Sequence, residues 1–115
     1  MNIKVTKPKT FQFENGTNEV EGEIFKPAEI KYKVSGAIEL GILIDLVMPV
    51  QVSVIKTQQL FLQLNSRESV QKALQGKSAW ADIFLVPFGT RERIGGLIME
   101  QELIHLGYGM IVRVE

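Results

Sequence analysis

The chain has 115 residues, a length typical of a single domain with one hydrophobic core. Its 13 basic and 13 acidic residues give a formal net charge of zero, so binding of a polyanion would require a local basic patch. The absence of cysteine excludes disulfides, thiolate metal sites and a cysteine nucleophile. The chain does not begin with the apolar core of a signal peptide, and no stretch reaches the ~20 apolar residues of a bilayer span. We therefore expect a cytoplasmic protein that does not bind membranes.

We expect one domain, residues 1–115, in which residues 1–27 form a β-hairpin in front of a barrel of residues 28–115. Phe11 and Phe13 precede Asn15-Gly16, a pair that readily adopts the positive φ angles of a tight turn. A two-stranded ribbon is marginally stable by itself. The hairpin is therefore expected to cover a sheet edge or to provide a surface for a protein partner or for oligomer formation.

Alternation of apolar and polar residues predicts a series of short strands in the rest of the chain. In the clearest case, apolar residues of one parity run from Ile38 to Leu46, with Glu39 and Asp45 in the other parity. Pro49 cannot donate to a strand ladder, so it is expected at a strand start or at a bulge. The predicted strands comprise residues 29–34, 38–46, 48–54, 60–64, 80–86, 93–99 and 110–114.

Two short helices are also expected. Ser66 is a typical N-cap and Gly76 a typical C-terminal stop, so residues 67–75 should form a helix that covers one open end of the barrel. A second helix is predicted over residues 100–106, ended by Gly107. Together these elements predict a mainly β fold, a small five-stranded barrel of the oligonucleotide/oligosaccharide-binding (OB) type with an additional N-terminal hairpin.

Several segments carry a family resemblance. Residues 88–98, FGTRERIGGLI, resemble the strand–turn–strand of staphylococcal-nuclease-like domains, in which an aromatic-glycine pair and an arginine precede an apolar strand. Residues 100–109 resemble the helix that follows in that family, and residues 64–68 and 34–38 lie where the family has two aspartate-bearing segments. The resemblance covers residues 34–112, and it implies an OB-type barrel that hydrolyses phosphodiester bonds with a calcium ion.

The resemblance implies roles for individual residues. Glu68 occupies the position of the catalytic glutamate near the attacking water, and Arg93 that of an arginine that stabilises the phosphorane charge. The two metal-binding aspartates, however, are replaced by Ala37 and Asn65, and the second phosphate-binding arginine by Leu60. Since calcium requires several oxygen ligands with negative charge, this chain lacks much of the set that the family uses.

The incomplete set favours a binding or interaction module that has no catalytic activity and no cofactor. If the ligand is nucleic acid, four basic residues are the expected phosphate contacts: Arg67, Lys77, Arg91 and Arg93.

Two other functions stay open. The first is a calcium-dependent phosphodiesterase with a rearranged site, in which Glu68 and Arg93 are catalytic and Asp45 binds the metal. That arrangement requires a strand register that turns Asp45 toward Glu68. The second is a structural or oligomerising protein, with subunit contacts made by the N-terminal hairpin and by strand edges.

The same residues have ordinary structural interpretations. Glu68 lies at a helix start, where the helix dipole stabilises a carboxylate by about 0.3–1 kcal/mol. His105, the single histidine, is interpreted as a residue of the second helix that has no partner for a zinc site. Four aromatic residues are interpreted as core and rim, with a base-stacking platform as the functional alternative: Trp80, Phe84, Phe88 and Tyr108.

Overall fold

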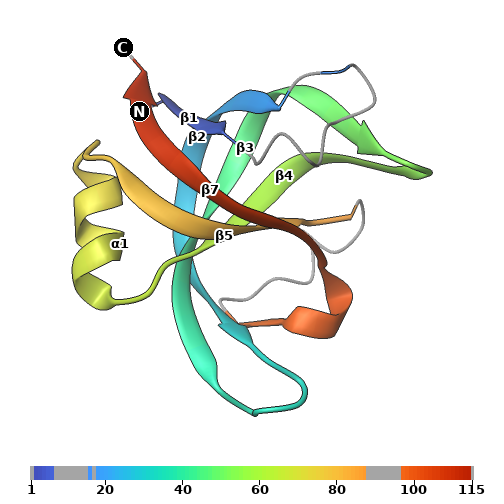
Figure 1. Cartoon of the computed structure of the whole chain (residues 1–115), viewed down its shortest axis with the longest axis vertical. Coiled ribbons are helices and arrows are strands. Elements are labelled where there is room, and N and C mark those ends of the chain that lie inside the picture. Colours follow the sequence, from blue (N-terminus) through green and yellow to red (C-terminus); the bar gives the residue numbers. More distant parts are fainter. Residues whose placement is uncertain (1, 7–15, 17, 88–96, 115) are drawn as a thin grey trace.

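The computed structural model describes residues 2–6, 16, 18–87 and 97–114, which form a closed barrel of six antiparallel strands with three further elements (Figure 1). The mainly β character and the barrel that the sequence predicts are confirmed. The wall consists of β1 (Asn2–Thr6), β2 (Glu19–Lys31), β3 (Ile38–Val52), β4 (Ile55–Gln63), β5 (Ala79–Leu85) and β7 (Ile104–Val114). The remaining elements are α1 (Arg67–Leu74), the short strand β6 (Leu97–Met99) and the 3-10 helix η2 (Glu100–Glu102).

Strand β1 closes the ring. It pairs with β2, where Thr6 lies opposite Glu19, and its other edge pairs with β7, where Thr6 lies opposite Met110. Around the ring the order is β1-β2-β3-β4-β5-β7, so the wall strands follow one another in chain order apart from the insertion of β6. Each wall strand has a partner on both sides over at least part of its length, so the described sheet closes on itself.

Aliphatic side chains fill the interior of the barrel, because alternate residues of each strand point to the same face. Burial of one such side chain stabilises the folded state by roughly 1.5–3 kcal/mol, so this core is the main source of stability. Its buried members include Ile3, Val5, Ile42, Ile44, Leu60, Leu62, Ile83, Leu85 and Ile111.

Helix α1 begins and ends as the sequence predicts. The Ser66 hydroxyl accepts a hydrogen bond from the backbone N–H of Ser69 at 3.1 Å. The helix is followed by Gly76, whose φ of 82° is a left-handed conformation that glycine adopts without strain. Val70 and Ala73 join the interior core, so α1 is held against the barrel. Within the described ranges, no helix is long and apolar enough to cross a membrane.

A second hydrophobic cluster lies on the outer face of the wall. Leu43, Phe61 and Phe84 alternate with residues of the interior core, and their side chains therefore point outward. Ile98 of β6 and Leu103 pack over them. Strand β6 pairs in parallel with β2, so it lies on the opposite side of this face from β5 and β7. We call this group the outer cluster.

Two details of the predicted barrel are wrong. The wall has six strands instead of five, because β1 and β2 are part of the wall and close the ring. Residues 38–52 form one strand, whereas the sequence pattern predicts two, over residues 38–46 and 48–54. The ladder between β3 and β4 is irregular between Asp45 and Val50, a segment that contains Pro49, as the missing donor of proline predicts. Of the predicted turn Asn15-Gly16, Gly16 has the expected positive φ, 82°, whereas Asn15 lies outside the described residues, as do Phe11, Phe13 and the charged turn at residues 89–93.

The helix predicted over residues 100–106 is also wrong. The 3-10 helix η2 ends at Glu102, and the chain is extended from Ile104 onward as β7. Leu103 packs in the outer cluster and Leu106 in the interior core, although residues three apart in a helix would share a face. In an extended strand, residues three apart lie on opposite faces, as Leu103 and Leu106 do, and a bulge beside Gly107, whose φ is 129°, shifts the register of the β5–β7 ladder after His105. Pairing with β5 thus overrides the local helix pattern.

Candidate functional site

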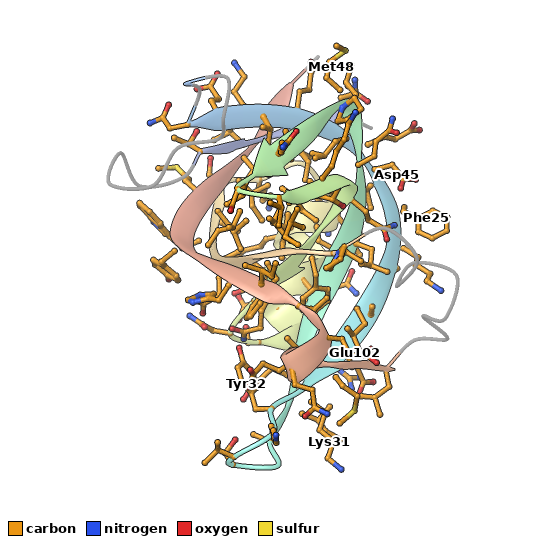
Figure 2. All side chains as sticks on the ribbon, turned by 90° about the vertical axis from the view of Figure 1, so that its right-hand side faces the viewer. Phe25, Lys31, Tyr32, Asp45, Met48 and Glu102 are labelled. Atoms are coloured by element: carbon orange, nitrogen blue, oxygen red, sulfur yellow. The ribbon has the colours of Figure 1, made fainter. Side chains whose placement is uncertain are left out.

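The two carboxylates proposed from the sequence for catalysis and metal binding lie on different elements and have separate partners. Glu68 is on the exposed side of α1, where its Oε1 lies 3.6 Å from the Nζ of Lys72. Asp45 is in β3, and its Oδ1 accepts a hydrogen bond from the Nε2 of Gln59 at 3.2 Å. Figure 2 shows Asp45 in the half of the barrel that carries Met48. These contacts therefore do not join the two carboxylates in one site.

A hollow of about 450 Å³ contains the two positions at which the resemblance places metal-binding aspartates, Ala37 and Asn65. Glu39 is the one carboxylate among its lining residues. Calcium takes 6–8 oxygen ligands and is bound tightly where several carry charge. In the part of the chain that the structure describes, no three His, Asp or Glu side chains are grouped to hold a metal ion. The described donor set does not fit the calcium ion that the resemblance implies.

The basic residues proposed as phosphate contacts are described only in part. Arg67 and Lys77 are exposed and lie at the two ends of α1, a helix whose 8 residues span about 12 Å. The backbone N–H of Lys77 donates to the carbonyl of Lys72 at 2.9 Å, which fixes the backbone of Lys77 at the helix end. Arg91 and Arg93 lie outside the described residues.

A second pocket, of about 320 Å³, is lined by Tyr32, Asp82, Phe84, Glu100 and His105, and we call it the Tyr32 pocket. The rings of Tyr32 and Phe84 meet edge to face with 6.4 Å between their centroids. The Phe84 ring also lies 4.8 Å from the ring of His105. The pocket therefore combines an aromatic wall with two carboxylates.

The pairing of β5 with β7 positions one side of this pocket. Alternation along β5 turns Ile83 into the interior core, whereas Asp82 and Phe84 point outward. Phe84 lies opposite His105 across the ladder, directly beside the bulge. Alternation places His105 outward and Leu106 inward, and the bulge between His105 and Gly107 allows Tyr108 also to lie on the outer face, opposite Asp82.

The other side of the pocket comes from the segments after β2 and β6. Tyr32 directly follows β2, and Glu100 is the first residue of η2. The backbone N–H of Lys33 donates to the Oε1 of Glu100 at 3.5 Å, a contact that links the two segments. In Figure 2, Tyr32 and Glu102, the last residue of η2, lie at the same end of the barrel.

A hydrogen bond holds Asp82 and His105 together. The Nε2 of His105 lies 3.0 Å from the Oδ1 of Asp82. Since an ionised carboxylate can only accept, the Nε2–H of His105 is the donor, whether the imidazole is neutral or charged. The contact orients the Asp82 carboxylate along the outer face and keeps the imidazole beside Phe84.

The pKa of Tyr32 reflects the electrostatics of the pocket. Burial raises the pKa of its hydroxyl above the ordinary value of 10.0, and the carboxylates of Asp82, Glu100 and Glu39 raise this pKa further. The hydroxyl donates to the Oε1 of Gln63 at 3.4 Å, which requires the neutral phenol. The field of the three carboxylates would favour a positive charge at this position, whereas burial disfavours a charge of either sign.

An aromatic pair continues the outer face of the wall beyond the pocket. The rings of Trp80 and Tyr108 stack with 5.5 Å between centroids and 9° between planes, and the two residues are 53% and 44% exposed. Tyr108 lies opposite Asp82 in the ladder, so the pair adjoins the pocket. Of the aromatic residues interpreted as core and rim, Phe84 is buried, whereas Trp80 and Tyr108 form an exposed surface. Phe88 lies outside the described residues.

Sequence reasoning did not select Tyr32, Asp82 or Glu100. The one available signal was Asp82, a lone carboxylate inside the apolar strand predicted over residues 80–86. Tyr32 and Glu100 belong to distant segments, and only the register of β5 with β7 and the position of η2 bring them together.

Fold and site together define a small antiparallel β-barrel with an acidic, aromatic-lined pocket on its outer wall. No protein-family model, curated protein or solved structure matches the chain. The chemistry of the pocket itself is therefore the basis for a functional proposal.

Proposed function

We propose that this protein is a binding module without catalytic activity, and that a cationic group of its ligand, an ammonium or a guanidinium, occupies the Tyr32 pocket. The observation that carries the proposal is the placement of the Asp82 and Glu100 carboxylates beside the rings of Tyr32 and Phe84 in one pocket of about 320 Å³. Carboxylates form charge-assisted hydrogen bonds with such groups, and the faces of aromatic rings attract cations.

The same charges disfavour nucleic acid at this pocket. A phosphate that entered it would meet Asp82 and Glu100 and would be repelled by both. The described basic candidates, Arg67 and Lys77, are not among the residues that line the pocket. A nucleic acid bound through α1 would therefore be insensitive to substitution of Glu100.

Binding is favoured over catalysis by the residues that line the pocket. The His105–Asp82 pair resembles a general base and its orienting carboxylate, but covalent catalysis by such a pair also needs a nucleophilic side chain within hydrogen-bond reach. The described lining residues provide no serine, threonine or cysteine, and the hydroxyl of Tyr32 is directed to Gln63.

The proposal is tested by titrating the protein with n-propylguanidinium and with the neutral, similarly shaped n-propylurea, followed by NMR. We expect n-propylguanidinium to shift the ring resonances of Tyr32, Phe84 and His105, with a Kd of roughly 1 mM, equivalent to about −4 kcal/mol. We expect n-propylurea to bind at least about tenfold more weakly, because it lacks the charge.

A pair of charge-matched variants locates the binding. Glu100→Gln should weaken n-propylguanidinium, whereas Glu68→Gln removes the same charge from the exposed side of α1 and should leave its affinity unchanged. Equal binding of the charged and the neutral probe, or equal effects of the two variants, would overturn the proposal. A single-stranded oligonucleotide that shifts the pocket resonances more strongly than the cation would also do so.

A further inference from the structure

We infer that the ligand of this site is an extended peptide segment whose basic side chain enters the Tyr32 pocket while an apolar or aromatic side chain four residues away packs on Trp80 and Tyr108. The inference rests on the proposed function and names the class of ligand. It follows from the arrangement of three outward-facing positions on one strand, Trp80, Asp82 and Phe84.

These positions form a continuous track along the outer face of β5. Phe84 lines the pocket at one end, and Trp80 stacks on Tyr108 at the other. Asp82 lies between them on the same face, opposite Tyr108 and hydrogen-bonded to His105. The apolar pair and the acidic pocket are therefore parts of one surface.

The spacing of the track matches an extended polypeptide. From Trp80 to Phe84 the strand advances four residues, about 13 Å at roughly 3.3 Å per residue. A ligand in the same extended conformation has side chains on one side at every second residue, so its residues i and i+4 reach both ends of the track. A free amine or a single amino acid would fill the pocket alone and leave Trp80 and Tyr108 unused.

The chemistry at each end selects the side chains. Asp82 and Glu100 select a lysine or an arginine, as proposed above for the pocket. Trp80 and Tyr108, 53% and 44% exposed, present a flat apolar surface on which an aromatic or aliphatic side chain loses contact with water.

Three peptides test the inference: Arg-Thr-Thr-Thr-Trp, Arg-Thr-Trp-Thr-Thr, and the first sequence with norleucine in place of arginine. Each is acetylated and amidated, and threonine favours the extended conformation. We expect the first peptide to bind about tenfold more tightly than the second and than n-propylguanidinium, because only its tryptophan reaches the aromatic pair. The norleucine peptide should lose about tenfold or more, because the pocket then holds no charge.

Variants test whether Trp80 and Tyr108 account for the higher affinity of the first peptide. Trp80→Ala and Tyr108→Ala should each reduce the affinity of the first peptide to that of the second, whereas Val54→Ala, an 87% exposed apolar residue in the β3–β4 turn, should leave it unchanged. Equal affinities of the two arginine peptides, or a Trp80→Ala variant that binds like the unsubstituted protein, would overturn the inference. If n-propylguanidinium binds and the spacing has no effect, the inference fails and the proposed function stands. If n-propylguanidinium does not bind, the proposed function itself fails.

Discussion

The outer surface of this barrel is covered on one side and open on the other. Over β2, β3 and β4, outward-facing residues such as Leu43 and Phe61 are buried beneath β6 and the segment around η2. Over β5 and β7, Trp80 and Tyr108 point outward in the same way and remain exposed. Phe84 lies on the boundary, buried in the outer cluster and also part of the Tyr32 pocket.

The covered side of the wall therefore contributes to stability, whereas the open side is available for binding. Apolar residues on the covered side have protein atoms packed over them and contribute to folding. Apolar residues on the open side contribute little to folding, yet remain available to a partner. The pocket lies where the two sides meet, because the chain that covers one side must return past β5 to form β7.

The largest expected effect distinguishes the two sides directly. Phe61→Ala should lower the free energy of unfolding by about 3–5 kcal/mol, because Phe61 is fully buried and its removal leaves a cavity in the outer cluster. Trp80→Ala should lower it by less than about 1 kcal/mol, because that side chain is half exposed. Urea denaturation of both variants measures the difference, and comparable losses would show that the open side also supports the fold.

A smaller loss of stability is expected from a substitution at Gly109, where β7 packs closely against β1. A Cβ at Gly109 would overlap the carbonyl oxygen of Thr6 in β1 and the side chain of Ile83. Gly109→Ala should therefore cost about 1–3 kcal/mol, the usual range for overpacking. Gly36→Ala is the comparison, since its Cβ would meet no neighbour within 4 Å and the cost arises only from its positive φ, about 1 kcal/mol. If both variants lose equally in thermal denaturation, close packing of β7 on β1 is not a determinant of stability.

Tyr32, which lines the pocket between the two sides, should affect the pH dependence of the free energy of unfolding. The pKa of Tyr32 is raised in the folded state, so as the pH increases past 10.0 the unfolded chain loses this proton before the folded protein does. The stability that the neutral phenol contributes is therefore complete below pH 10.0 and is lost as the pH rises through the folded-state pKa. Urea denaturation between about pH 8 and about pH 11 should show a steeper decline for the unsubstituted protein than for Tyr32→Phe. Parallel curves would contradict the assignment.

The smallest expected effect lies on α1, away from both sides. Glu68→Gln removes an exposed i,i+4 ion pair with Lys72, so it should change the free energy of unfolding by no more than about 0.5 kcal/mol. It should also leave any phosphodiesterase activity of the preparation unchanged, because no metal site of described residues includes Glu68. A nicking assay with plasmid DNA and calcium, in which this variant abolished activity, would instead support the enzymatic role that the resemblance implies.

Part of this structure could be read from local sequence because local physical chemistry decides it. The alternation of Asp82 with Ile83 and of Phe84 with Leu85 reflects a strand with two faces, and Ser66 and Gly76 mark the ends of α1. The length, the apolar content and the series of short strands were sufficient to predict a small barrel. The missing hydrogen-bond donor of Pro49 was sufficient to place an irregularity in β3.

Pairing between distant segments decided the rest. Residues 100–106 fit a helix as well as a strand, and the choice was made by their ladder with β5 and by the bulge at Gly107. The number of wall strands depended on the pairing of β1 with both β2 and β7, which are remote from each other in the chain. The site was beyond sequence reasoning for the same reason, since Tyr32, Asp82 and Glu100 come from three separate segments. Local sequence determines which face of a strand is apolar, but only the closed sheet determines which outer face is covered and which is left open to a ligand.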